Sequence, residues 1–119
     1  MKLSVVIPVF NEAPSLRALH QRLARTLEKL GQAYEIIFVD DGSRDESASV
    51  LRALRARDAA VRMIRFHHNY GQHAALFAGM ERARGDVVVT LDAPVFHREP
   101  PGRWPSLRAL RLSRRLGVE

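Results

Sequence analysis

Acidic residues stand at or close to the ends of three short apolar runs of this 119-residue sequence. The runs and their acids are residues 5–9 with Glu12, residues 36–39 with Asp40 and Asp41, and residues 87–91 with Asp92. Predominantly apolar runs of this length are typical of strands buried on both faces of a parallel sheet. Ligands of open α/β sheets bind where such strands end, so these carboxylates are expected to share one sheet edge. There they suit a nucleotide base, a ribose or a divalent metal that carries a diphosphate.

The segment after the first run has the pattern of a helix that covers the sheet. Its leucines recur every three or four positions, with basic residues between them: Leu16, Leu19, Leu23, Leu27 and Leu30. Pro14 suits the first turn of this helix and Gly31 suits its C-terminal cap. A second helix is predicted after Ser43, with Ser43 as its N-cap and Glu46 bonding back to the Ser43 amide.

The third part of the chain continues the alternation of strand and helix. Residues 61–66 alternate apolar and basic residues, which indicates a strand nearer the sheet edge. The alanine-rich segment after residue 73 predicts a helix whose small residues let it lie close to the sheet, and Gly85 ends it. The order βαβαβαβ predicts a three-layer α/β/α fold, Rossmann-like, with a mainly parallel sheet and right-handed crossovers.

Composition sets limits on the class of protein. The chain has the length of one small domain and contains no cysteine, which excludes disulfides, thiolate metal sites and a cysteine nucleophile. No apolar stretch approaches the roughly 20 residues of a membrane span, and Pro8, Asn11 and Glu12 interrupt the first run too early for a signal peptide. We expect a cytoplasmic protein, or one bound peripherally at the cytoplasmic face of the membrane.

Residues 94–119 differ in composition from residues 1–93. They hold six Arg against two Glu and four of the six prolines, whereas residues 1–93 hold 13 Lys and Arg against 11 Asp and Glu. This pattern predicts an irregular, basic C-terminal tail that is disordered or forms one short amphipathic helix around Leu107, Leu110 and Leu116. Contact of the tail with an anionic membrane or with nucleic acid is the alternative.

Four ordered motifs resemble glycosyltransferase family 2. They are residues 6–12 (Val-Ile-Pro-Val-Phe-Asn-Glu), 39–43 (Val-Asp-Asp-Gly-Ser), 69–73 (Asn-Tyr-Gly-Gln-His) and 90–93 (Thr-Leu-Asp-Ala). The third motif looks most like the polyprenyl-phosphate sugar transferases of bacterial envelopes, such as the undecaprenyl-phosphate and dolichyl-phosphate groups. The resemblance implies that residues 1–93 are the nucleotide-sugar-binding half of a GT-A domain and that residues 94–119 are a divergent tail.

The resemblance also implies roles for individual residues. Pro8, Phe10 (where the family usually has Tyr) and Glu12 would line the nucleoside pocket, with Val39 beside the base. Asp41, alone or together with Asp40, would accept a hydrogen bond from the base edge, because a carboxylate only accepts and so selects an N–H. The alternative for the two aspartates is that they cap the following helix, where negative charge is favourable.

A metal is implied by the last motif. Asp92 and Ala93 begin the family's Asp-X-Asp signature, whose carboxylates hold Mg²⁺ or Mn²⁺ against the diphosphate of the bound nucleoside-diphosphate sugar. The second acidic position is Pro94 here, which has no side-chain oxygen, so a weakened metal site is expected. The implied activity is an inverting transfer of the sugar to a polyprenyl phosphate or another envelope acceptor.

The family's continuation is not recognisable after Pro94, so the chain is interpreted as an N-terminal fragment whose end arose by a shifted reading frame, a rearrangement or gene decay. A non-catalytic nucleotide-binding remnant is the second hypothesis. His67, His68 and His73 lack the spacing of a zinc site and are interpreted as loop or surface residues. No specific nucleic-acid partner is expected. An uncovered sheet edge predicts self-association.

Overall fold

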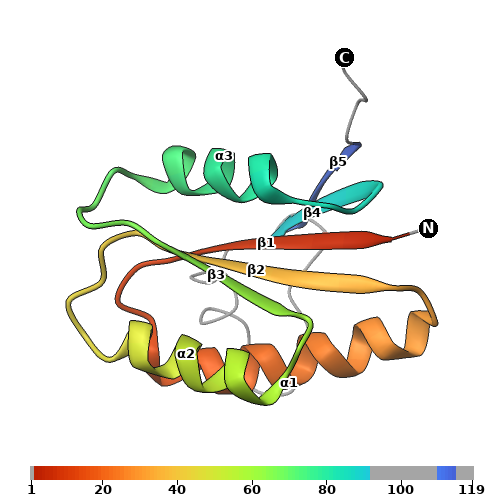
Figure 1. Ribbon diagram of the computed structural model, residues 1–119, viewed down its shortest axis with the longest axis horizontal. Helices are drawn as coiled ribbons and strands as arrows, with labels where there is room; N and C mark the ends of the chain where they lie inside the picture. The colour runs from red at the N-terminus through yellow and green to blue at the C-terminus, as the bar shows by residue number, and fades with distance from the viewer. Residues whose placement is uncertain (1, 92–109, 115–119) are drawn as a thin grey trace.

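The computed structural model describes residues 2–91 and 110–114, which form one twisted sheet with helices on both faces (Figure 1). The strands are β1 (Leu3–Val9), β2 (Tyr34–Asp40), β3 (Val61–Arg65), β4 (Val87–Leu91) and β5 (Leu110–Arg114), and the helices are α1 (Ala13–Leu30), α2 (Ser47–Arg57) and α3 (Gln72–Arg82). The strand order is β3-β2-β1-β4-β5. The first four strands are parallel, as predicted, and β5 runs antiparallel to β4.

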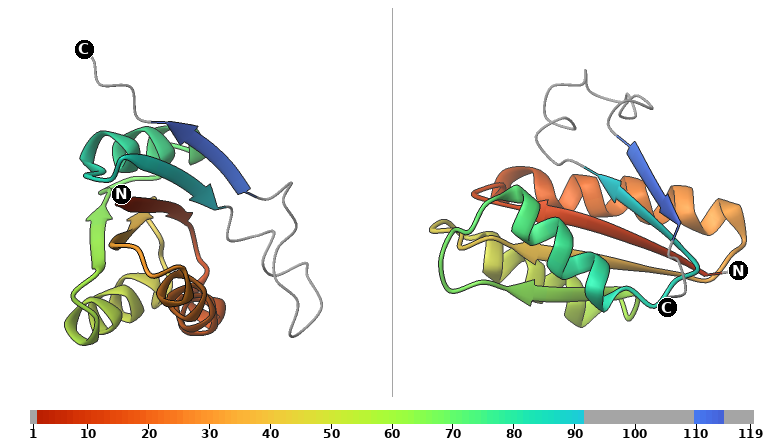
Figure 2. Two further views of the ribbon diagram at one scale, coloured as in Figure 1. Left: turned by 90° about the vertical axis from the view of Figure 1, so that its right-hand side faces the viewer. Right: turned by 90° about the horizontal axis from the view of Figure 1, so that it is seen from above.

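One face of the sheet is covered by α1 and α2, as Figures 1 and 2 show. The predicted leucine stripe of α1 is confirmed up to Leu27, because Leu16, Leu19, Leu23 and Leu27 are buried in the main core. Leu30 lies in the last turn and is 56% exposed. Gly31 ends the helix with a φ of 68°, in the left-handed region that glycine adopts without strain.

The other face is covered by α3, which packs closely on β1 and β2 (Figure 2). Gly79 is the point of closest approach, since a methyl group there would collide with the Val6 side chain. Ala75 is fully buried in the same cluster, together with Ile37 and Val39. The prediction that small residues let this helix lie near the sheet is therefore confirmed, and β3 is confirmed as an edge strand among the described residues.

The predicted capping box of the second helix is wrong. Helix α2 begins at Ser47 rather than beside Ser43, and its N-cap residue Glu46 makes no side-chain capping bond. Asp45 instead accepts a hydrogen bond from the Ser47 amide, at 2.9 Å. The Ser43 hydroxyl accepts a bond from the Asn11 amide, so a tertiary contact has replaced the local cap.

Of the predicted tail, the structure describes only residues 110–114. Residues 110–114 form β5, which pairs with the outer side of β4 and covers that edge of the sheet. The predictions for Asp92, Ala93, Pro94 and the rest of the tail concern residues outside the described ranges. Within residues 2–91 and 110–114, no helix is both long and apolar enough to cross a membrane.

Candidate functional site

The loops that follow β1, β2 and β3 surround one pocket of about 490 Å³. Its lining residues are Phe10, Asn11, Gly42, Ser43, Arg44, Arg65, Phe66, His67, His68 and Asn69. This is the carboxyl edge of the parallel strands, where the sequence predicted a ligand. Two phenylalanines, two arginines and two histidines make the wall both aromatic and basic. Such a wall suits a ligand with a flat ring and negative charge.

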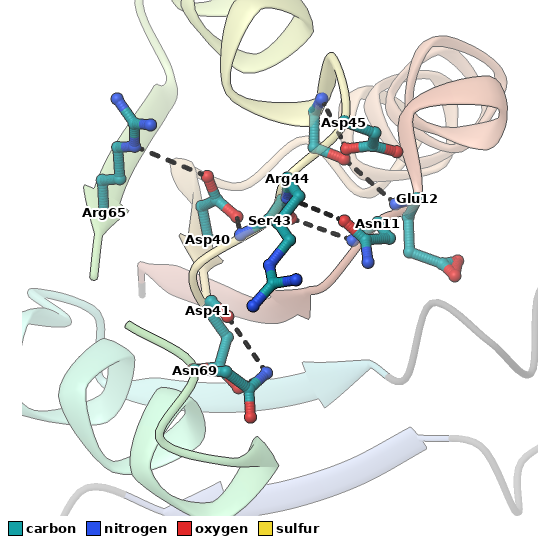
Figure 3. A network of polar contacts seen from close by, with 10 residues as sticks. Asn11, Glu12, Asp40, Asp41, Ser43, Arg44, Asp45, Arg65 and Asn69 are labelled. Atoms are coloured by element: carbon teal, nitrogen blue, oxygen red, sulfur yellow. Dashed lines mark hydrogen bonds and ion pairs between the residues drawn. The ribbon is translucent and has the colours of Figure 1, made fainter. Parts of the chain in front are cut away.

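Hydrogen bonds join the loop after β1 to the loop after β2 (Figure 3). The Asn11 amide donates to the Ser43 hydroxyl at 2.9 Å, and the Arg44 amide donates to Asn11 Oδ1 at 2.9 Å. Asn11 has a φ of 53°, a left-handed conformation that asparagine tolerates better than most residues. The two loops therefore form one unit, which fixes Phe10 and Arg44 on the pocket wall.

Hydrogen bonds also join the start of α1 to the start of α2. The Glu12 amide donates to the Ser47 hydroxyl at 3.0 Å, and the Ala13 amide donates to Asp45 Oδ2 at 3.2 Å. Desolvation alone would raise the pKa of the Asp45 carboxyl, but hydrogen bonds from Ser47 and from the Ala13 amide hold that pKa below its usual value. An ionised Asp45 thus stabilises both helix starts beside the pocket.

Asp40 is fully buried at the end of β2 and keeps one acceptor atom without a hydrogen bond. Its Oδ1 accepts the Ser43 amide at 3.0 Å. Its Oδ2 has no hydrogen-bond partner within the described chain, and the Nε of Arg65 lies 3.9 Å away (Figure 3). Arg65 is about half exposed on the pocket wall. A buried oxygen left without a donor is unfavourable, so this position favours a ligand that brings an N–H.

The Asp41 carboxylate accepts hydrogen bonds from the segment before α3. Its Oδ1 accepts the Tyr70 amide at 2.7 Å, and its Oδ2 accepts the Gly71 amide at 3.0 Å and the Asn69 side-chain amide at 3.2 Å. Gly42 keeps the same loop close, because a methyl group there would lie 2.6 Å from the His68 carbonyl carbon. Asp41 therefore holds the segment that forms one pocket wall and leads into α3.

The alternative that the two aspartates cap the following helix is wrong, since α2 begins at Ser47 without either of them. Of the other residues expected at the site, Phe10 lines the pocket and is 44% exposed. Glu12 is half-buried at the start of α1, and Pro8 is buried within β1. Val39 is fully buried against α3, so its side chain packs in the core.

The residues that β3 and its loop contribute were missed from the sequence as pocket residues: Arg65, Phe66, His67 and His68. The histidines are indeed exposed loop residues, as predicted, yet they also line the pocket. The alternation of basic and apolar residues over 62–65 could have indicated that Arg65 lies at the pocket, because β3 pairs with β2 and Arg65 lies opposite Asp40. Arg44 was missed as well, and its place follows from the bond to Asn11.

Four parallel strands with α1 and α2 on one face and α3 on the other, and a pocket at the carboxyl edge, are the arrangement of the nucleotide-binding half of a GT-A fold. Solved structures agree. The mannosyltransferase PcManGT from Pyrobaculum calidifontis, in complex with GDP-Man and Mn²⁺, matches with a TM-score of 0.61 and 25% identity over 76% of this chain and 27% of its own. S. aureus TarS 1-349 matches with a TM-score of 0.66 and 23% identity, over 78% and 27% of the two chains.

The sequence comparisons give the family. The family model described as Glycosyl transferase family 2 matches residues 4–101, and the chain belongs to this family. Undecaprenyl-phosphate 4-deoxy-4-formamido-L-arabinose transferase from Pseudomonas paraeruginosa is 51% identical over 87% of this chain, and the protein of that name from Shewanella sediminis is 45% identical over 89%. The chain spans only about 30% of the length of these curated relatives.

Proposed function

We propose that the pocket at the carboxyl ends of β1, β2 and β3 binds a nucleoside-diphosphate sugar, as the donor-binding part of a glycosyltransferase that uses polyprenyl phosphate. The observation that carries this proposal is the buried Asp40 oxygen without a hydrogen-bond donor, set beside an aromatic and basic wall. The names of the relatives support the acceptor class, since they specify undecaprenyl phosphate. The Pyrobaculum mannosyltransferase supports the donor class, since it holds GDP-Man.

In the proposed complex, the base enters beside Phe10 and its ring N–H bonds to Asp40 Oδ2. The Arg65 Nε lies 3.9 Å from that oxygen, too far for a hydrogen bond. The entering base would displace this guanidinium, whose side chain is about half exposed. Phe10 and Phe66 offer ring faces or edges to the base, a contact that tolerates different bases. Arg44 is exposed on the rim and supplies positive charge for the diphosphate.

A divalent ion fits the donor chemistry of this edge. Asp92 directly follows β4, which pairs in parallel with β1, and a carboxylate is the hard oxygen ligand that Mg²⁺ and Mn²⁺ prefer. Mg²⁺ is commonly bound through one or two carboxylates, with phosphate and water oxygens as its other ligands. When bound, the ion would neutralise charge that grows on the departing diphosphate.

The described residues need only bind and orient the donor. In an inverting transfer, an acceptor oxygen attacks the anomeric carbon, the bond from that carbon to the diphosphate breaks, and the nucleoside diphosphate leaves. A phosphate monoester has a second pKa of about 6, so the acceptor oxygen is already ionised at neutral pH and needs no base. The contribution of Asp40, Phe10 and Arg44 is therefore positional: they hold the anomeric carbon in reach of the acceptor.

Calorimetric titration of the chain with UDP, GDP, CDP and ADP, each with Mn²⁺, tests the proposal. We expect saturable binding of at least one nucleotide. We expect Asp40→Asn to weaken it tenfold or more, because the Asn amide can present hydrogens where an acceptor is needed. Glu81→Gln removes an exposed acid of α3 and serves as the matched control, with an expected change below twofold. If the folded wild-type chain binds none of these nucleotides at millimolar concentration, the proposal fails.

A further inference from the structure

Helices α1 and α2 carry the excess positive charge of the described chain. Together they contain seven Lys and Arg against one Glu. All other residues within 2–91 and 110–114 hold eight Lys and Arg against nine Asp and Glu. Because α1 and α2 lie side by side on one face of the sheet, with α3 on the other, this charge is concentrated on one side of the molecule (Figure 2).

Most of these cations face solvent without an acidic partner. Six of the seven are exposed: Arg17, Arg25, Lys29, Arg52, Arg55 and Arg57. The ion pairs formed within the described chain involve none of these six. A hollow of about 570 Å³ between the two helices is lined in part by Arg17, Arg25 and Arg57. Two acids also line the hollow. Asp58 is already paired with His20 at 2.8 Å, and Glu28 takes part in none of the ion pairs of the described chain.

We propose that these exposed residues of α1 and α2, here called the α1–α2 face, dock on an anionic phospholipid surface. Several Lys and Arg side chains on one face attract anionic headgroups, and their long aliphatic stems lie well against the interface. Neither helix contains Phe, Tyr or Trp, so the face has no platform on which the bases of a single-stranded nucleic acid would stack. The choice of lipid rests on the proposed function, whose acceptor is a lipid phosphate.

The α1–α2 face lies next to the nucleotide pocket, because both helices begin close to the loops that form the pocket. Helix α1 begins three residues after the pocket residue Phe10, and the Glu12 amide bonds to Ser47 at the start of α2. A chain lying on its α1–α2 face would therefore keep the pocket mouth beside the headgroups. A lipid-linked phosphate could then reach a donor held in the pocket without leaving the interface.

Co-sedimentation with vesicles of 30% phosphatidylglycerol in phosphatidylcholine at low salt tests this surface. We expect the wild-type chain to bind and the double variant Arg25→Gln with Arg57→Gln to bind about 30-fold more weakly, since each surface cation contributes roughly fivefold. The matched control, Arg82→Gln with Arg84→Gln, removes the same charge from exposed positions in and after α3 and should change binding less than threefold. Salt at 0.5 M should release the wild-type chain.

Three results would overturn the docking proposal. They are absence of wild-type binding to these vesicles, equal loss of binding in the two double variants, or tighter binding to a DNA duplex with the same sensitivity to Arg25 and Arg57. The nucleotide titration of the Arg25 and Arg57 double variant separates this proposal from the proposed function. If the double variant keeps its nucleotide affinity but loses vesicle binding, both proposals are supported. If the wild-type chain binds vesicles but no nucleotide, the docking proposal stands and the proposed donor site is refuted.

Discussion

Replacement of Asp41 by Asn should destabilise the fold, because this carboxylate gathers three donors from the loop that precedes α3. The donors are the amides of Tyr70 and Gly71 and the side-chain amide of Asn69, at 2.7, 3.0 and 3.2 Å. Asp41 is only 3% exposed, so water cannot take over these bonds. An Asn side chain keeps one acceptor oxygen but turns an NH₂ group toward the remaining donors.

The size of the loss follows from the bonds that the variant breaks. A hydrogen bond to a charged acceptor contributes about 1.5–3 kcal/mol, and a donor left without a partner adds a cost of similar size. If the retained oxygen accepts the Tyr70 amide, the Asn variant loses the bonds to Gly71 and Asn69. These losses overlap, so we expect Asp41→Asn to lower the free energy of unfolding by about 3 kcal/mol. Asn69→Ala removes only the side-chain donor and should cost about 1 kcal/mol.

Urea unfolding followed by far-ultraviolet circular dichroism measures both variants against the wild-type chain. The m-value should stay constant, because the substitutions change no large area of buried surface. If Asp41→Asn unfolds within about 0.5 kcal/mol of the wild-type free energy, the account of Asp41 as the anchor of residues 69–71 is wrong. Should Asp41→Asn fail to fold, Asn69→Ala still decides the question, since a loss near zero there contradicts the same network.

Three further predictions concern the core and the pocket. Burial would raise the pKa of the Glu35 carboxyl, but hydrogen bonds from Ser4, the Arg84 amide and Arg62 hold that pKa below its usual value. The free energy of unfolding of the wild-type chain should therefore fall as the pH drops below the ordinary glutamate pKa. Glu35→Gln should make this free energy less dependent on pH, as measured by urea unfolding between pH 6 and 3. Gly79→Ala should lower the free energy of unfolding by about 2 kcal/mol, because the added methyl group collides with Val6. The double variant Gly79→Ala with Val6→Ala should lose less than the sum of the two single losses. Strict additivity would contradict the close approach of α3. Phe10→Ala should weaken nucleotide binding about tenfold with an unchanged urea midpoint, whereas a shifted midpoint would indicate a packing role.

The elements of the fold were predictable from the sequence because they follow from local patterns. An apolar run as short as residues 36–39, with polar residues on either side, favours a buried strand over a helix because of its length. The leucine spacing of α1 favours a helix. Gly31 marked the helix end through its freedom to adopt a positive φ. For β1 to β4, the alternation of strands and helices then favoured parallel pairing, because each of these connections is too long for a hairpin.

The site was only partly predictable, since its decisive contacts join residues far apart in the chain. Ser43 and Asp45 are both good capping residues, and only the position of Asn11 decides that Ser43 bonds to the first loop. Asp40 and Asp41 are neighbours of one type, yet they differ because residues 69–71 approach one of them and Arg65 the other. Periodicity indicates that residues 61–65 form a strand, but it does not show that this strand lies beside β2.

The location of nucleotide binding on the chain decides whether the donor site lies at the carboxyl edge of the sheet. Backbone amide resonances of the ¹⁵N-labelled chain can be followed by NMR during a titration with the nucleotide that calorimetry selects. We expect the largest shifts in the loops after β1, β2 and β3, at Phe10, Arg44 and Phe66, and no shifts in the hollow between α1 and α2. Shifts confined to that hollow, or no shifts at millimolar nucleotide, would contradict the assignment of the donor site to this edge of the sheet.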